Sequence, residues 1–178
     1  EIYSVQFNGE RDFMVLPAVS VGLAAVSMWA WVYTDALQPH TTEELFLTGA
    51  APPSGTFSTA TSDWTTLHVN GQDSGRSMQN GAWSNVPKET WVHLHFESEA
   101  LIFSDLHLMA SSLSSAATRA GNLKGALSEV YTWSRRLQAY EIATVVGGFD
   151  WNKPNLVGLA AYYRMEERST FLKDSTLQ

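Results

Sequence analysis

The stretch Gly121–Val146, GNLKGALSEVYTWSRRLQAYEIATVV, combines the two kinds of secondary structure that decide the fold. Its first half has the two-residue period of a β-strand, which predicts a strand ending at Trp133. The alternation places Leu127, Glu129, Tyr131 and Trp133 on one face, and Ala126, Ser128, Val130 and Thr132 on the other. Its second half spaces Leu137, Ile142 and Val145 or Val146 at helical separations, which predicts a short amphipathic helix near Gln138–Val146. We expect this helix to cover the edge or the end of a sheet structure.

The rest of the chain is dominated by short runs of β-branched and aromatic residues separated by Gly, Pro, Asn and Asp. The strands predicted on this pattern are Ile2–Asn8, Asp12–Leu16, Ala24–Thr34, Glu44–Thr48, Thr56–Thr59, Trp64–Asn70, Trp91–Glu97, Leu101–Met109, Leu123–Trp133 and Leu156–Met165. Asn8-Gly9 and Asn70-Gly71 are dipeptides of the kind that closes hairpins. The pattern indicates an antiparallel two-sheet sandwich or a barrel, without parallel βαβ units.

Composition and net charge limit the classes of function that the chain can have. The chain has 178 residues, of which 44% are hydrophobic, and this predicts a single domain over residues 1–178 with a substantial core. The net charge of −7, without a Lys/Arg cluster, argues against nucleic acid and against an anionic membrane surface as partners. Polar residues and Pro17 interrupt the longest apolar run, Val15–Trp31, so we expect no membrane insertion.

Five segments resemble laminin-G-like and pentraxin-like jellyroll domains of the concanavalin A-like lectin/glucanase superfamily. In the opening stretch, the matching positions are Gly125, Val130, Trp133, Leu137, Glu141 and Ile142. VQFNGERDFMVLP and VSMWAWVY resemble the opening strands of that family, ETWVHLHF its W-x-H-V strand, and GFDWNKPNLVGLAAYYRME its last strand. The resemblance implies an all-β, two-sheet antiparallel jellyroll sandwich with one short helix in the C-terminal part. It also implies an extracellular or organelle-lumenal domain.

The resemblance does not extend to an enzyme site. Related endoglucanases carry carboxylates spaced E-x-D-x-x-E on one strand, where they act as nucleophile, helper and acid. The nearest approach in this chain is Glu10-Arg11-Asp12, with Val15 where the acid would stand. We therefore expect no catalytic residues and no enzymatic activity.

Metal binding and cofactors are not expected either. Pentraxins hold calcium with acidic and amide side chains ahead of their closing strand, but Leu106–Ser128 contains no Asp or Glu. A single calcium ion bound by other loops, for instance through Asp63 or Asp73, stays open. His93 and His95 share one strand face at a spacing that metal sites use. Without a third ligand, we interpret them as solvent-facing positions opposite Val92, Leu94 and Phe96.

Aromatic residues are abundant, and two groups of them are candidate contact sites. Trp29, Trp31 and Tyr33 alternate with Met28, Ala30 and Val32, so this strand either is packed on both faces or presents its tryptophans as a platform for sugar rings. The loop NGAWSNVP places Trp83 beside the amides and hydroxyl of Asn80, Ser84 and Asn85. Trp83 in that setting is suited to a sugar or to a protein hot spot, unless it folds back onto its own sheet.

Two functions are therefore predicted. The first is a non-enzymatic recognition module that binds a glycan or a protein surface without a metal ion, using Trp29, Trp31 and the Trp83 loop. The second is an accessory subunit or adhesion spacer, docked into a larger protein assembly. The tryptophan content favours the first function, and the missing acidic ligands favour the second.

Overall fold

The computed structural model describes residues 3–8, 12–33, 46–48, 64–74, 86–103, 105–109, 124–148, 157–163 and 165. These residues form an all-β structure with antiparallel pairing and one short helix. The strands are β1 (Val5–Asn8), β2 (Met14–Leu16), β3 (Leu23–Val32), β4 (Phe46–Thr48), β5 (Trp64–Val69), β6 (Gln72–Asp73), β7 (Trp91–Ile102), β8 (Leu106–Leu108), β9 (Lys124–Trp133) and β10 (Leu159–Tyr163). The helix α1 spans Ala139–Val146, as the sequence predicts.

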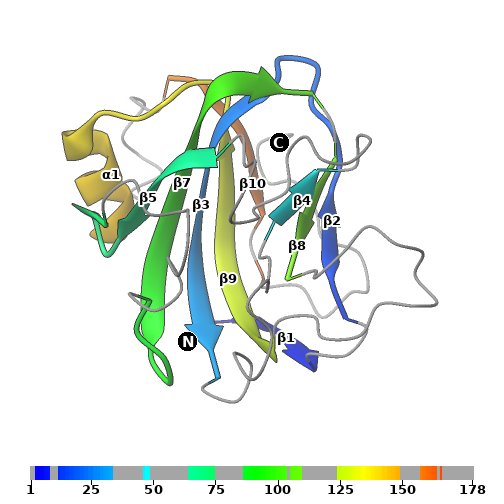
Figure 1. The fold of residues 1–178 in the computed structure, drawn as a ribbon, viewed down its shortest axis with the longest axis vertical. Coiled ribbons are helices and arrows are strands. Elements are labelled where there is room, and N and C mark those ends of the chain that lie inside the picture. The colour runs from blue at the N-terminus through cyan, green and yellow to red at the C-terminus, as the bar shows by residue number, and fades with distance from the viewer. Residues whose placement is uncertain are drawn as a thin grey trace.

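The strands form two sheets within the described residues. The large sheet has the order β1-β9-β3-β7-β5-β6, and β10 pairs with the same β9 strand. The small sheet has the order β2-β8-β4. Figure 1 shows the large sheet between α1 on one side and the small sheet on the other. The large sheet therefore has two different faces: an inner face toward the small sheet, and an outer face toward α1.

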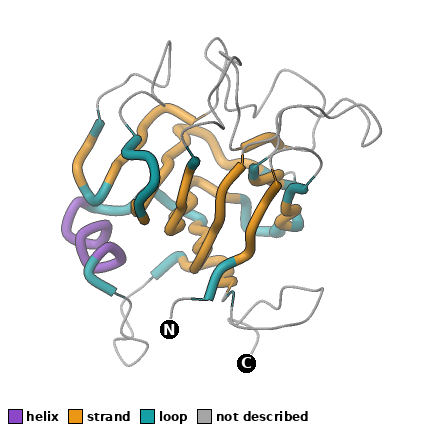
Figure 2. Tube along the Cα trace, turned by 90° about the horizontal axis from the view of Figure 1, so that it is seen from below, coloured by secondary structure: helices purple, strands orange, loops and turns teal. Residues whose placement is uncertain are grey.

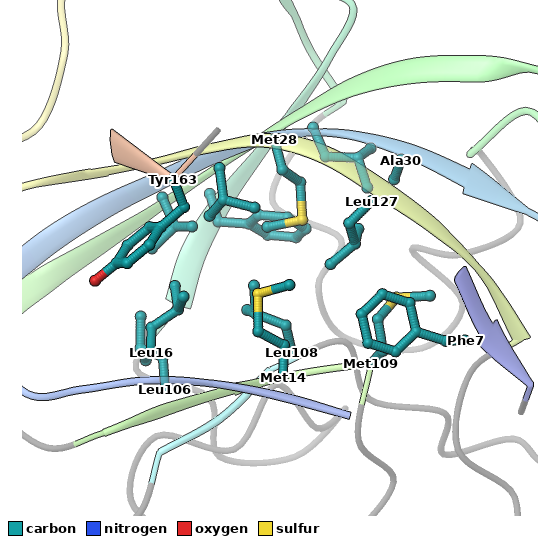
Figure 3. Close-up of a cluster of buried hydrophobic side chains, with 14 of the residues drawn as sticks. Phe7, Met14, Leu16, Met28, Ala30, Leu106, Leu108, Met109, Leu127 and Tyr163 are labelled. Carbon is teal, nitrogen blue, oxygen red and sulfur yellow. The ribbon is translucent and has the colours of Figure 1, made fainter. Parts of the chain in front are cut away.

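The main core lies between the inner face of the large sheet and the small sheet. Met14, Leu16, Leu106 and Leu108 from the small sheet point toward Met28, Ala30 and Leu127 of the large sheet (Figure 3). Each of these side chains is buried. Because alternate residues of a strand point to opposite faces, this arrangement assigns the even-numbered residues from Val26 to Val32 of β3 to the inner face.

A second, smaller core lies on the outer face, beneath α1. It contains Ala25, Tyr131, Trp133, Leu137, Ile142, Val145 and Tyr162. The rings of Tyr131 and Tyr162 stack with centroids 4.5 Å apart. Because this core joins residues of β3, β9 and β10 to residues of α1, the helix packs on a face of the large sheet. Figures 1 and 2 show α1 at one side of the strands.

Two glycines allow close backbone geometry. A Cβ atom on Gly125 would lie 2.2 Å from the carbonyl oxygen of Trp31, so only glycine lets β9 approach β3 at this point. At the β5–β6 hairpin, Asn70 and Gly71 have φ angles of 52° and 81°. Positive φ at both turn residues is the requirement of a tight two-residue hairpin, so the prediction for Asn70-Gly71 is confirmed.

Three details of the sequence prediction are wrong. Leu101–Met109 is not one strand, because β7 ends at Ile102 and the chain crosses to β8 in the other sheet. Asn8-Gly9 does not close a hairpin, because β1 pairs with β9 while β2 pairs with β8. Asn8 and Asp12 are instead joined by reciprocal bonds, in which the Asn8 N–H donates to the Asp12 carboxylate and the Asp12 N–H donates to the Asn8 side chain.

The third error concerns the faces of β9. The strict alternation assigned Leu127 to the face of Tyr131 and Trp133, but Leu127 and Val130 both lie in the main core. Glu129 between them has a φ of 51°, and the register with β3 shifts between Ser27 and Trp29. This β-bulge inserts an extra residue and exchanges the faces, so that Tyr131 and Trp133 pack under α1.

The predicted strand Thr56–Thr59 lies outside the described residues. The other strand predictions correspond to described strands with shorter or longer bounds, and β6 was not predicted. No helix among the described residues is long and apolar enough to cross a membrane.

Candidate functional site

The outer face of the large sheet carries polar and aromatic side chains that are not part of the main core between the two sheets. Cross-strand pairing between β3 and β7 arranges them as successive rungs, which are Trp31 with Trp91, Trp29 with His93, Ser27 with His95, and Ala25 with Glu97. The Ala25 end of this ladder lies in the core under α1. We call the Ala25–Ser27 rungs the covered end and the Trp29–Trp31 rungs the aromatic end.

A buried polar network occupies the covered end. Glu97 accepts two hydrogen bonds from the Arg136 guanidinium, at 3.0 and 2.8 Å, and one from the backbone N–H of Leu137 at 3.2 Å. The His95 Nε2 atom lies 3.3 Å from the same carboxylate. Glu97 is 3% exposed, so this carboxylate is a buried anchor for the segment that leads into α1.

The network continues from His95 into the sheet. Burial alone would raise the pKa of Glu97, but the hydrogen bonds from His95 and Arg136 outweigh it and lower the pKa to about 2. The ionised carboxylate accepts the Nε2–H of His95, which assigns Nδ1 as an acceptor for the Ser27 hydroxyl at 2.6 Å. Ser27 Oγ in turn accepts the Trp133 indole N–H at 3.2 Å.

This network has the connectivity of a hydrolase relay, with a hydroxyl, an imidazole and a carboxylate in order. A nucleophile, however, must reach a substrate atom. The Ser27 side chain is completely buried, and its oxygen already contacts both His95 and Trp133. The geometry therefore supports a structural role, in which the network ties β3, β7 and β9 to the segment before α1.

A second ion pair fixes the start of the helix. Arg135 donates from Nη1 to Glu141 at 2.9 Å and pairs with it through Nη2 as well. The Glu141 carboxylate also accepts the backbone N–H of Gln138 at 2.7 Å, which satisfies one of the free N–H groups at the helix start. These contacts give a physical reason for the R-x-L-x-x-x-E-I pattern, because Arg135 and Glu141 pair with each other while Leu137 and Ile142 are buried in the second core.

The aromatic end is built from two edge-to-face ring pairs. The rings of Trp31 and Trp91 are 6.0 Å apart at 72°, and those of Trp29 and His93 are 5.5 Å apart at 73°. The three tryptophans are half-buried, and they alternate with the buried Ala30 and Val92 of the inner face. The structure therefore brings the sequence-predicted pair Trp29 and Trp31 together with Trp91 and His93, which sequence reasoning had not connected to them.

His93 is the polar centre of the aromatic end. It is completely buried, which corrects the expectation that His93 and His95 face solvent. Its backbone is held by the β5–β6 hairpin, since the Asn70 side chain accepts the His93 N–H at 2.9 Å and the Asn70 N–H donates to the His93 carbonyl at 2.8 Å. Burial lowers the pKa of His93 to about 3, and the neighbouring His95 and His68 add to this effect. The imidazole is therefore neutral at physiological pH.

Three buried nitrogen atoms at the aromatic end have no hydrogen-bond partner. They are Nε1 of Trp31 and both ring nitrogens of His93, and no other buried side-chain atom of the described residues is unpartnered. An unsatisfied buried donor or acceptor costs about 1–3 kcal/mol, so this concentration in one place is unusual for a purely structural face. His95 differs, because both of its nitrogens have a partner.

The other sites predicted from the sequence are the Trp83 loop and the possible metal ligands. Asn80, Trp83, Ser84 and Asn85 lie outside the described residues, and so do Asp63 and most of Leu106–Ser128. Within the described ranges, no group of three or more His, Cys, Asp or Glu side chains is placed to hold a metal ion. A hollow of about 410 Å³ beside the β5–β6 turn is lined by Val69, Asn70, Gln72, Asp73 and Ser74, and it includes none of the aromatic-end residues.

Comparison of the chain with family models, with curated proteins and with solved structures finds no match. The functional argument therefore rests on the geometry of the outer face.

The anchoring role of Glu97 predicts the effect of Glu97→Gln. The amide cannot pair with Arg136 as the carboxylate does, so the free energy of unfolding should fall by about 1–3 kcal/mol. This loss of stability should be smaller than for a fully buried ion pair, because the Arg136 side chain is 49% exposed and remains hydrated. Chemical denaturation measures the change. Glu99→Gln, an exposed site on the same strand, is the matched control and should shift stability by less than about 0.5 kcal/mol. Equal effects of the two substitutions would contradict the role of Glu97.

The buried histidine predicts loss of stability in acid. The His93 pKa is about 3 in the folded state and 6.5 in the reference state, so between these values the unfolded chain binds the additional proton. The contribution of His93 is fully present above pH 6.5 and is lost as the pH falls toward 3, by up to about 4–5 kcal/mol. Burial also lowers the pKa of His95, which acts in the same direction.

Denaturation of the wild type and of His93→Gln at several pH values between 7 and 4 tests this expectation. The variant should show a clearly shallower decline, because one titrating group has been removed. An unchanged slope in the variant would mean that His93 is not buried as a neutral imidazole.

Proposed function

We propose that this chain is a non-enzymatic recognition module with a laminin-G-like or pentraxin-like jellyroll fold, extracellular or organelle-lumenal, which binds its ligand without a metal ion at the aromatic end of the outer face. The proposal combines the sequence resemblance with the arrangement of the two sheets around one main core. The ligand class follows from the side chains: half-buried indoles beside unpartnered polar nitrogens suit a glycan, or a protein surface with similar groups.

The observation that carries the proposal is the difference between the two ends of one face. At the covered end, each polar nitrogen has a partner and α1 packs over the aromatic rings. At the aromatic end, the indoles remain partly exposed and three buried nitrogens have no partner. A ligand that stacks on the partly exposed indole rings would complete the aromatic end as α1 completes the covered end.

An exposed apolar cluster favours the alternative function, an accessory subunit or spacer docked into a larger assembly. Val21, Leu101 and Phe103 are 55%, 47% and 60% exposed. Leu101 and Phe103 both lie against Gly22, because a Cβ atom there would approach each of them to within 3.0 Å. A partner protein that covered this cluster would gain apolar burial without using the aromatic end.

Binding to an immobilised glycan array with paired variants tests the proposal. Trp91→Ala should weaken binding of the selected glycan by about 2 kcal/mol, which is the scale of an interface hot spot, while the protein stays folded. Phe103→Ala should leave glycan binding unchanged. Glycan binding by Trp91→Ala at wild-type strength, with loss of binding in Phe103→Ala, would overturn the proposal, because the contact would then lie at the apolar cluster and not at the aromatic end.

A further inference from the structure

The exposed apolar cluster of Val21, Leu101 and Phe103 holds its side chains in fixed positions. The Phe103 ring is 60% exposed, yet a Cβ atom on Gly22 would lie 2.9 Å from it, so one side of the ring rests on the backbone. Leu101 lies against the same glycine. Gly22 is buried, and its N–H donates to the Val19 carbonyl at 3.0 Å. A partner that bound this supported cluster would lose little free energy to the ordering of side chains.

A bulge in β7 presents this part of the chain to solvent. The register with β3 shifts between Leu23 and Ala25, whose partners on β7 are Ile102 and Glu97. The extra residues of β7 between these pairs include the exposed segment Glu99–Leu101, and Ile102 then returns to the main core. Bulges re-aim side chains and are frequent beside functional sites.

Acidic side chains lie at both ends of the apolar cluster. Glu99 stands two residues before Leu101, and Asp105 stands two residues after Phe103, so the Cα atoms within each pair are at most about 8 Å apart. Both acidic residues are exposed. Asp105 Oδ1 accepts the Ala18 N–H at 2.8 Å, which fixes this carboxylate beside the turn that carries Val21. The cluster therefore has negative charge on either side of its apolar surface.

None of the ion pairs within the described part of the chain neutralises these two acidic residues. The described Lys and Arg side chains contact other groups: Arg135 pairs with Glu141, Arg136 pairs with Glu97, Lys124 lies over the Tyr33 ring, and Lys88 donates to the Val86 carbonyl. The net charge of the whole chain, −7, has the same sign. Charge complementarity therefore favours a basic partner and disfavours an anionic membrane surface.

We infer that the apolar cluster docks a basic amphipathic helix of a partner protein, whose apolar stripe covers Val21, Leu101 and Phe103 and whose Lys or Arg side chains approach Glu99 and Asp105. A helix of this kind carries basic residues on both sides of one apolar stripe, which matches an apolar cluster with an acidic residue at each end. The inference rests on the alternative function, docking into a larger assembly, and specifies its partner. It does not involve the aromatic end.

The experiment measures the binding of fluorescein-labelled synthetic peptides by fluorescence anisotropy at physiological ionic strength. The main probe is a peptide of about 15 residues, long enough to form a helix, with a stripe of Leu and Phe flanked by Lys on both sides. A second peptide carries Glu in place of each Lys. A third has the composition of the first in an order that destroys the stripe. The first peptide should bind at least about tenfold more tightly than either of the others.

Variants of the protein test the assigned contacts. Phe103→Ala and Leu101→Ser each remove apolar contact, and each should weaken binding of the basic peptide by about tenfold. Glu99→Gln combined with Asp105→Asn removes both charges and should weaken binding by about three- to fivefold. The Asn side chain keeps an acceptor for the Ala18 N–H, so the turn should stay in place.

The matched control is Asp73→Asn combined with Glu89→Gln, which removes two exposed acidic side chains elsewhere on the chain. This control should keep the affinity within about twofold of the wild type, because salt screens charges that lie far from the bound peptide. Equal weakening by the two double variants would overturn the inference, since binding would then depend on net charge and not on the apolar cluster.

Two further outcomes would overturn the inference. They are unchanged peptide affinity in both Phe103→Ala and Leu101→Ser, and binding to phosphatidylcholine vesicles that requires Phe103 while the basic peptide does not bind. Trp91→Ala separates this inference from the proposed recognition site, because it should bind the basic peptide as the wild type does. If Trp91→Ala loses the peptide while Phe103→Ala keeps it, the docking inference fails and the aromatic end still stands as a recognition site.

Discussion

The constraint on which this structure depends is that the outer face of the large sheet is longer than the helix that covers it. An eight-residue helix such as α1 extends about 12 Å, while the ten residues of β3 extend about 33 Å. The helix can therefore complete only one end of the face. Glu97 fixes which end, because it binds Arg136 and the Leu137 N–H directly before α1 begins. The helix therefore does not cover the aromatic end, which begins beyond Ser27 and His95.

The two ends of the outer face differ in how their aromatic side chains are covered and hydrogen-bonded. Under α1, Tyr131, Tyr162 and Trp133 stack, and the indole N–H of Trp133 donates to Ser27. Beyond the helix, aromatic rings again cover the sheet, but Trp31 and His93 have no partner for their nitrogens. Proteins retain such unsatisfied groups at a cost in stability, and functional sites are a frequent place for them.

Much of the fold could be predicted because local signals agreed with burial. The alternation in β3 and β7 and the helical spacing of Leu137, Ile142 and Val145 depend only on the period of each element. The bulge at Glu129 and the crossing of the chain after Ile102 could not be predicted, because both depend on pairing between distant segments. The candidate site shows the same division. Trp29 and Trp31 were found by alternation within one strand, but their association with Trp91 and His93 required the register of β3 against β7. The two-residue spacing of His93, His95 and Glu97 can be seen in the sequence. If the neighbouring strand β3 had been known to be buried on both faces, this spacing would have predicted a buried polar network.

The most direct test of this account is the solvent accessibility of the individual tryptophan rings in the free protein. A soluble paramagnetic agent broadens the NMR signals of protons that solvent can approach, and each indole ring gives its own signals. The account predicts clear broadening for ring protons of Trp29, Trp31 and Trp91, which are half-buried, and none for Trp133, which is completely buried. If the rings of the aromatic end were as protected as Trp133, no ligand could stack on them, and the division of the outer face into a covered and a binding end would be contradicted.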